Sequence, residues 1–305
     1  MPENRKSILL ATLAMIAITL LWGGSFSVIK VALSHFHLFV VTFLRMVLAA
    51  ALFGLCWGKI RRVRVLRCDI PFILLMIFCE PCLFFTFEAF ALSQTTASQA
   101  GMIVALTPMF IAAAALIFLN ERPGILVWVG FAVAILGVMI LSYDSSATAS
   151  APNPILGNFM EALAMCAAAG FVIGLKKLKG AYPPLFLAGT QALGGAIFFM
   201  FTLLLPGVHW PNSWPLLPTL AIVYLGALIT FLGISLYNYG LSGLPATRSA
   251  GLLNLVSVFA VIFGVIFLGE RLTWLQWAAC GLVLLGVFIS RRAPVKHAKT
   301  EPRTE

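Results

Sequence analysis

The phrase "VIFLGER", Val265–Arg271, closely repeats "LIFLNER", Leu116–Arg122. In both, an apolar run ends in a small residue and a Glu–Arg pair. The two glutamates, Glu121 and Glu270, lie 149 positions apart, and at this offset Leu92–Ile140 overlays Leu241–Ile289 without a gap. The Glu, Arg and Trp identities in this overlay (Glu121/Glu270, Arg122/Arg271, Trp128/Trp277) are hard to obtain by chance from apolar sequence. We therefore interpret the chain as a duplication.

The composition of the 305-residue chain predicts a polytopic membrane protein. The sequence is 61% hydrophobic and 10% charged, whereas soluble domains carry about 25% charged residues. Its apolar runs reach the roughly 20 residues that a helix needs to cross a bilayer. The net charge of +10 lies in short clusters between these runs, so we expect no nucleic-acid partner and a lipid bilayer around the chain.

Ten apolar runs predict an all-α fold with ten transmembrane helices, since a spanning segment must satisfy its own backbone hydrogen bonds. The polar stretch "DSSATASAPNPILG" after the fifth run is typical of a linker and divides the chain into two five-helix repeats, residues 8–143 and 155–292, with a tail at 293–305. The runs are Ile8–Ile29, Phe36–Trp57, Ile70–Phe90, Ala100–Leu119, Ile125–Tyr143, Ile155–Leu175, Leu185–Leu205, Leu216–Tyr239, Ser249–Leu268 and Trp274–Ser290.

The basic residues predict that the two repeats are inverted. Lys and Arg in short loops stay on the cytoplasmic side. With a cytoplasmic N-terminus, 17 of the 20 Lys and Arg residues fall inside, the exceptions being Lys30, Arg45 and Arg271. Both termini are then cytoplasmic, as is the tail, the linker is outside, and the second repeat enters the membrane upside down. Inverted repeats are typical of secondary transporters, whose substrate site lies near the midplane between the repeats.

Several stretches carry a resemblance to a known family. "LLWGGSFSVIK" (Leu20–Lys30), "ASQAGMIVALTPMF" (Ala97–Phe110) and the two Glu–Arg turns resemble the EamA-type members of the drug/metabolite transporter superfamily. The resemblance implies an inner-membrane permease that exports a small organic solute, such as an amino acid, a metabolite or a drug, through a cavity lined by the third, fourth, eighth and ninth helices and their neighbours. The second half lacks the Trp–Gly pair, so Trp22 has no symmetric counterpart.

Ionisable residues within the apolar runs are candidates for the substrate or ion pathway, because they are costly in a bilayer. Glu80 and Glu88 are eight residues apart, or about 80° around a helix, so both can face one cavity as a proton acceptor or a counter-charge to an amino group. The alternative is that one of them only pairs with Arg45 as packing. Pro81 removes a backbone donor and predicts a kink beside Glu80.

Further polar positions extend this candidate pathway. We expect Arg45 to be buried in an ion pair. Tyr237 overlies Glu88 across the duplication, so that symmetric position is polar in both halves. Asn254 lies in an apolar helix and needs either a helix or a ligand as its partner. Pro108 predicts a hinge that frees the carbonyl near Val104. For Glu161, near the outer end of the sixth run, we expect contact with headgroup water, with a functional role as the alternative.

The two Glu–Arg pairs, Glu121–Arg122 and Glu270–Arg271, are interpreted as turn anchors, each glutamate suiting the positive end of the following helix, with a gating part as the alternative. "CEPC" (Cys79–Cys82) has the spacing to hold a soft metal; we interpret it as small residues at a kink, and expect no metal and no cofactor. The Phe-rich third run does not define a substrate class.

The function predicted from the sequence is an inner-membrane secondary transporter that exports a small solute by alternating access, with protons as a candidate partner. The chain contains no phosphate-binding G-x-x-x-x-G-K-[ST] motif, so we expect no ATP hydrolysis. The alternatives are a membrane-embedded enzyme, disfavoured because no histidine lies in the interior of a run, and a non-transporting membrane protein.

Overall fold

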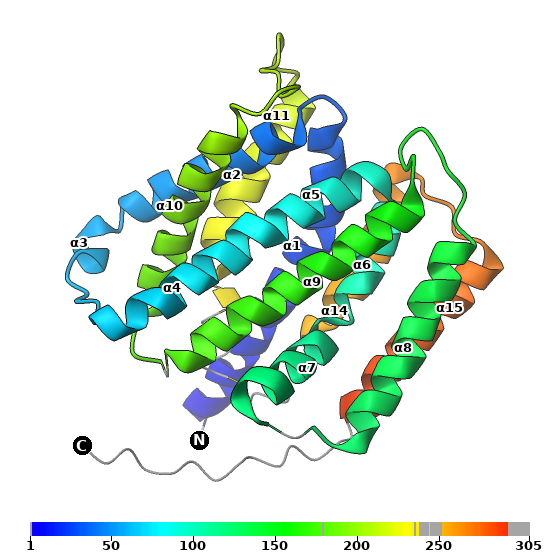
Figure 1. The fold of residues 1–305 in the computed structure, drawn as a ribbon, viewed down its shortest axis with the longest axis horizontal. Helices are drawn as coiled ribbons and strands as arrows, with labels where there is room; N and C mark the ends of the chain where they lie inside the picture. The colour runs from blue at the N-terminus through cyan, green and yellow to red at the C-terminus, as the bar shows by residue number, and fades with distance from the viewer. Residues whose placement is uncertain are drawn as a thin grey trace.

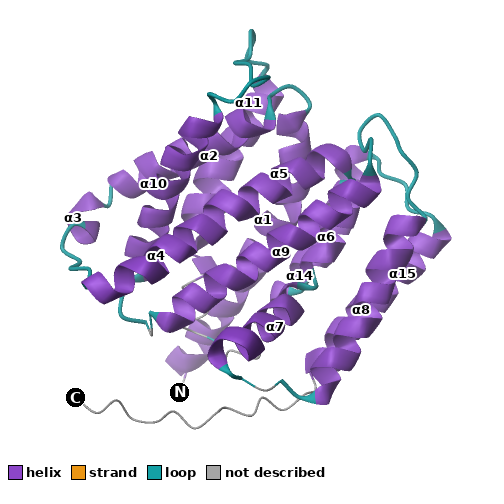
Figure 2. Cartoon of the chain, in the orientation of Figure 1, coloured by secondary structure: helices purple, strands orange, loops and turns teal. Residues whose placement is uncertain are grey.

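A computed structural model describes residues 2–121, 123–178, 180–234, 236–237, 244 and 252–291. Nearly all of these residues are helical, and the described part contains no strand (Figure 2). The elements are α1 (Pro2–Leu33), α2 (Leu38–Gly54), α3 (Trp57–Ile60), η1 (Arg67–Asp69), α4 (Ile70–Ile77), η2 (Phe78–Leu83), α5 (Phe84–Gln94), α6 (Ala97–Val104), α7 (Thr107–Leu119), α8 (Ile125–Tyr143), α9 (Pro154–Lys177), α10 (Pro184–Thr202), α11 (Leu216–Val223), η3 (Tyr224–Leu232), α14 (Leu255–Leu268) and α15 (Trp274–Arg291).

The described chain contains 6 helical segments long and apolar enough to cross a membrane, and four shorter apolar helices. Each of the ten predicted runs overlaps one of these segments. The long ones are Ile8–Leu33, Arg67–Gln94, Ala97–Leu119, Ile125–Tyr143, Pro154–Lys177 and Pro184–Thr202, and the shorter ones are Leu38–Gly54, Leu216–Leu232, Leu255–Leu268 and Trp274–Ser290. The predicted tail, 293–305, lies outside the described residues.

The repeated phrase forms the same helix end twice. Asn120 ends α7 and Gly269 ends α14, both in the left-handed conformation, with φ of 54° and 65°. In this conformation glycine is unstrained and asparagine is tolerated. The amide of Glu121 then donates to Ala115 O, and that of Glu270 donates to Gly264 O, both at 3.2 Å. The small residue of each phrase is therefore explained by the turn it makes.

Two predicted spans are broken in the middle. The third consists of α4, the π-helical η2 and α5, and Glu80 inside η2 has extended backbone angles, φ −141° and ψ 114°. The fourth divides into α6 and α7, with Pro108 in the first turn of α7. The hydroxyl of Thr107 donates to the carbonyl of Val104 at 2.5 Å, the carbonyl that Pro108 leaves without its helical donor.

The helices are arranged as a bundle beside a separate pair (Figure 1). Helices α8 and α15, one from each half of the sequence, pack along each other at one edge. In the rest of the bundle, α1 packs against α14, α5 against α9 and α2 against α10. The start of α1 and the end of α15 lie at one end of the helices, and the linker after α8 lies at the opposite end (Figure 1).

Candidate functional site

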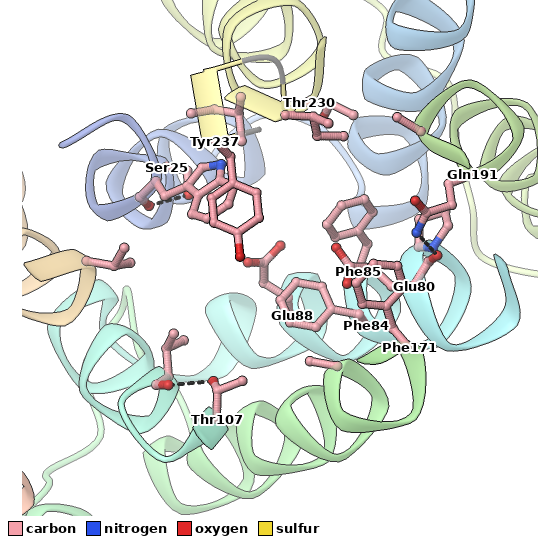
Figure 3. A pocket seen from close by; sticks show the side chains of 18 of the residues that line it. Ser25, Glu80, Phe84, Phe85, Glu88, Thr107, Phe171, Gln191, Thr230 and Tyr237 are labelled. Carbon is pink, nitrogen blue, oxygen red and sulfur yellow. Dashed lines mark hydrogen bonds between the residues drawn. The ribbon is translucent and has the colours of Figure 1, made fainter. Parts of the chain in front are cut away.

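A cavity of about 370 Å³ lies inside the bundle. Its walls come from α1, α2, η2, α5, α6, α7, α9, α10, η3 and α14, so both halves of the sequence build it. The pair formed by α8 and α15 contributes no lining residue. Figure 3 shows that Glu80, Glu88, Thr107, Gln191 and Tyr237 point into the same space from different helices. A mostly apolar cavity with a few convergent polar groups is typical of a small-molecule site.

The charged centre of the cavity is an ion pair between Arg45 on α2 and Glu88 on α5, with Arg45 Nη1 lying 3.5 Å from Glu88 Oε2. Both side chains are buried. Arg45 Nε also donates to Thr230 Oγ1 at 3.0 Å, and its Cζ lies 3.9 Å above the centre of the Phe85 ring. The guanidinium is thus fixed on two sides, while its contact with Glu88 is longer than the about 2.7–2.9 Å of a strong charge-assisted bond. The pair predicted for Arg45 is present, and it is loose.

Glu80 reaches the same cavity by a different route from the predicted one. A continuous helix would place Glu80 and Glu88 about 80° apart, but the backbone is not helical at Glu80. The break at Pro81 exposes the carbonyl of Glu80, which accepts from Gln191 Nε2 of α10 at 2.8 Å. Both Glu80 and Glu88 line the cavity. The predicted kink and the predicted orientation of both acids toward one cavity are therefore both present.

Aromatic side chains form much of the remaining wall. Tyr237 and Trp22 are in contact, with ring centroids 5.4 Å apart, and both line the cavity together with Phe84, Phe85 and Phe171. Aromatic faces contribute apolar contact area and attract cations weakly. The cavity therefore combines opposite charges at its centre with apolar walls.

Asn254 is not part of the cavity lining. It stands at the N-terminal boundary of α14 with no capping bond from its side chain, while its neighbours Leu253 and Val256 do line the cavity. Leu252 and Leu253 before it are helical, Asn254 itself lies in a turn, and α14 begins at Leu255, so the expected helix is interrupted at Asn254. Pro108 and Pro81 both lie where the helices break, and Pro81 lines the cavity itself.

The turn anchors depart from the prediction in one respect. Glu270 does not cap the helix that follows it. Its Oε1 accepts from the amide of Ala97 at 2.7 Å and its Oε2 from that of Ser98 at 2.9 Å, at the start of α6. Tertiary packing brings the turn onto this other helix end, which sequence spacing does not reveal. Arg271 is exposed, and Arg122 lies outside the described residues.

Glu121 differs from its symmetric counterpart Glu270. Its carboxylate accepts from Lys176 Nζ on α9 at 3.0 and 3.2 Å, and both side chains of this pair are partly exposed. The two glutamates of the repeated phrase therefore have different partners in this structure, a helix N-terminus for Glu270 and a lysine for Glu121.

The expectation that Glu161 reaches headgroup water is wrong. Its residue is 0% exposed, because α9 begins at Pro154 and Glu161 lies two turns inside it, against α5. Three polar residues that were not predicted also line the cavity: Gln191, Thr230 and Thr107. Each is a polar residue inside an apolar run, and that signal was available in the sequence.

A buried ion pair that faces a cavity, within a bundle of membrane-length apolar helices, is typical of a substrate or ion pathway through a membrane. The sequence matches the EamA-like transporter family over residues 9–143 and 155–292. The chain belongs to this family, and it is a multi-pass membrane protein. The resemblance noted from the sequence is thereby confirmed.

Named relatives are similar to the chain over most of its length. An "Uncharacterized transporter YcxC" of Bacillus subtilis is 29% identical and covers 91% of each chain. A "Probable amino-acid metabolite efflux pump" of Salmonella typhimurium is 28% identical, covering 94% of this chain and 95% of its own. A "Probable terminal-alkyne amino-acid exporter" of Streptantibioticus cattleyicolor is 25% identical over 92% of this chain and 93% of its own.

A solved structure titled "Crystal structure of protein" has the same fold. It superimposes with a TM-score of 0.63 at 20% sequence identity and covers 92% of this chain and 96% of its own.

Proposed function

We propose that the chain is a secondary transporter of the inner membrane that exports an amino acid, or a derivative that keeps the amino and carboxyl groups, by alternating access. The observation that carries this proposal is the loose ion pair of Arg45 and Glu88 in the cavity. A zwitterionic amino acid presents one group to each partner: its carboxylate to the guanidinium, which suits planar anions, and its ammonium to Glu88. Two of the relatives carry names that refer to amino acids.

The surrounding residues are assigned supporting roles. Glu80 supplies a second negative charge for the ammonium group, and Tyr237 forms part of the cavity wall. The substrate's side chain packs against the aromatic residues. Pro81 and Pro108 serve as hinges, while the Glu–Arg turns anchor the ends of moving helices. Asn254 does not line the cavity and has no role in this proposal.

The architecture that accompanies this proposal is ten transmembrane helices in two inverted repeats, residues 8–143 and 155–292, with both termini cytoplasmic. The basic residues of the sequence support it, and so does the position of the linker, at the opposite end of the helices from the start of α1 (Figure 1). Inverted repeats around a shared site allow one half to rock against the other.

The proposal predicts that Glu88→Gln abolishes substrate exchange. Glutamine keeps the volume of glutamate and removes the charge that pairs with the ammonium group. The measurement is counterflow in proteoliposomes with radiolabelled L-leucine and L-phenylalanine, with L-glutamate as an acidic comparison. Wild-type protein should exchange at least one of the two neutral amino acids, and Glu88→Gln should lose the exchange.

Glu121→Gln is the matched control, because its carboxylate is partly exposed and lies outside the cavity. It should exchange at the wild-type rate. Equal exchange by wild type and Glu88→Gln would contradict the role of Glu88. Failure of wild-type protein to exchange either neutral amino acid would contradict the substrate class, and failure with every solute would favour an enzyme or a non-transporting protein.

A further inference from the structure

Glu161 on α9 is a buried acid that the proposed substrate site does not use. The residue is 0% exposed, and in the described part of the chain neither of its two carboxylate oxygens has a hydrogen-bond partner. Asn158, one turn away on the same helix, accepts from Thr95 Oγ1 at 2.7 Å. Asn158 of α9 thus has a hydrogen-bond partner, whereas Glu161 of the same helix has none among the described residues.

The packing of α9 on α5 brings Glu161 next to Glu88. Gly157 of α9 packs against the last turn of α5 and its C-cap, Thr95. The approach is so close that a Cβ on Gly157 would lie 2.6 Å from Thr95 Cβ and 2.9 Å from Ala91 O. The chain leaves α5 and enters α9 at the same end of the bundle (Figure 1), so the two helices run in opposite directions. One turn further along each of them are Glu161 and Glu88, which interact electrostatically.

The charges around Glu161 indicate whether its carboxyl group is ionised or protonated. The elements packed against α9 are α4, η2, α5, α6, α7 and α8, and the titratable groups that they direct toward the cavity are Glu80 and Glu88. Among the described residues that line the cavity, the cation is Arg45, which is paired with Glu88. One positive charge therefore faces three carboxyl groups, of which those of Glu88 and Glu161 are buried and that of Glu80 is half-buried. An ionised carboxylate buried without a partner costs several kcal/mol, so such a group takes up a proton instead.

We propose that Glu161 is the proton-binding residue of the transport cycle: it holds a proton while the cavity is empty and releases it when a substrate ammonium group binds beside Glu88. This inference rests on the proposed function. The ammonium adds a positive charge next to Glu161, which stabilises the ionised carboxylate, and one proton leaves Glu161 for water as the substrate enters. On the return of the empty carrier, Glu161 takes up one proton from the opposite side. Substrate and proton then move in opposite directions.

Infrared spectroscopy of purified, substrate-free protein tests the proton assignment without any substrate. Wild type at neutral pH should show the carbonyl stretch of a protonated carboxyl group that shifts in D2O, and Glu161→Gln should lose this intensity. Glu121→Gln, which removes a partly exposed carboxylate, should keep it. Persistence of the full band in Glu161→Gln would overturn the assignment. Glutamine mimics the protonated acid, so the variant is expected to fold.

Efflux from proteoliposomes tests the coupling, with preloaded radiolabelled L-phenylalanine as the probe. Acidifying the outside should accelerate efflux by wild type, and Glu161→Gln should retain efflux but lose the acceleration. Acceleration equal to that of wild type would reduce Glu161 to a packing residue. Complete loss of efflux and of substrate binding would place it in the substrate site instead. Absence of L-phenylalanine flux in wild type would count against the proposed substrate, while the infrared band still decides where the proton is.

Discussion

Glu270 shows how one residue of the repeated phrase connects distant parts of the chain. Both of its carboxylate oxygens accept backbone amides at the start of α6, where the helix dipole is positive. At the same junction Lys30 donates to the carbonyls of Leu92, Thr95 and Ser150. The end of α1, the turn between α5 and α6, the linker and the turn after α14 are thereby joined. Glu121 makes only a partly exposed ion pair.

This difference predicts unequal effects of the same substitution. Glu270→Gln loses the charge at the helix end and one of two acceptor oxygens suited to the amides, and should destabilise the protein by about 1–2 kcal/mol. Glu121→Gln should change stability by less than about 0.5 kcal/mol. Thermal unfolding midpoints in detergent provide the measurement. Equal midpoints for the two variants would mean that the cap on α6 contributes nothing.

At the residue scale, the sequence indicates polar side chains but not their partners. Glu80, Glu88 and Arg45 stand out because charges are rare in apolar runs, and all three line the cavity. The burial of Glu161 depends on how α9 packs on α5, and the cap by Glu270 depends on contacts between segments far apart in sequence. Those distances are set by tertiary structure, which a single sequence does not show.

At the element scale, α8 and α15 pack along each other with their backbones in close contact. A Cβ on Gly286 would lie 2.5 Å from the carbonyl oxygen of Gly130, and one on Gly130 would lie 2.4 Å from that of Gly286. The backbones can approach this closely because neither residue has a side chain. Small residues at helix contacts are the usual means of association in membranes, where no hydrophobic effect drives helices together.

Gly286→Ala should therefore destabilise the protein, because overpacking costs about 1–3 kcal/mol and exceeds the gain in helix propensity. Gly281→Ala on the same helix is the matched control: a Cβ there meets nothing within 4 Å, so only the propensity gain of up to about 1 kcal/mol remains. The two unfolding midpoints should move in opposite directions. A Gly286→Ala midpoint at or above that of wild type would contradict this packing.

The apolar runs predicted where helices lie, and in places their ends: Ile125–Tyr143 coincides with α8. The periodicity of a run does not show breaks inside it. Prolines suggested a kink at Pro81 and a hinge at Pro108, and breaks occur at both, but the extended backbone of Glu80 and the π-helix of η3 were not predicted. Both depend on contacts with neighbouring helices.

At the scale of the whole molecule, both halves of the sequence contribute walls to one cavity, while α8 and α15 stand apart as a pair (Figure 1). This division separates the elements that line the cavity from a pair of helices that contributes nothing to its lining. Under the proposed function, the halves rock against each other, the cavity opens to one side of the membrane at a time, and the linker stays outside throughout.

Cysteine accessibility tests this claim of alternating access most directly. In a variant whose six cysteines are replaced by alanine, Ala168→Cys places a thiol in the cavity wall, and Ser146→Cys places one in the exposed linker. Both are treated with a membrane-impermeant thiol reagent in right-side-out and in inside-out vesicles. The account predicts that Ala168→Cys is modified from both sides and Ser146→Cys from the outside alone. Modification of Ala168→Cys from one side only, or of Ser146→Cys from the inside, would contradict it.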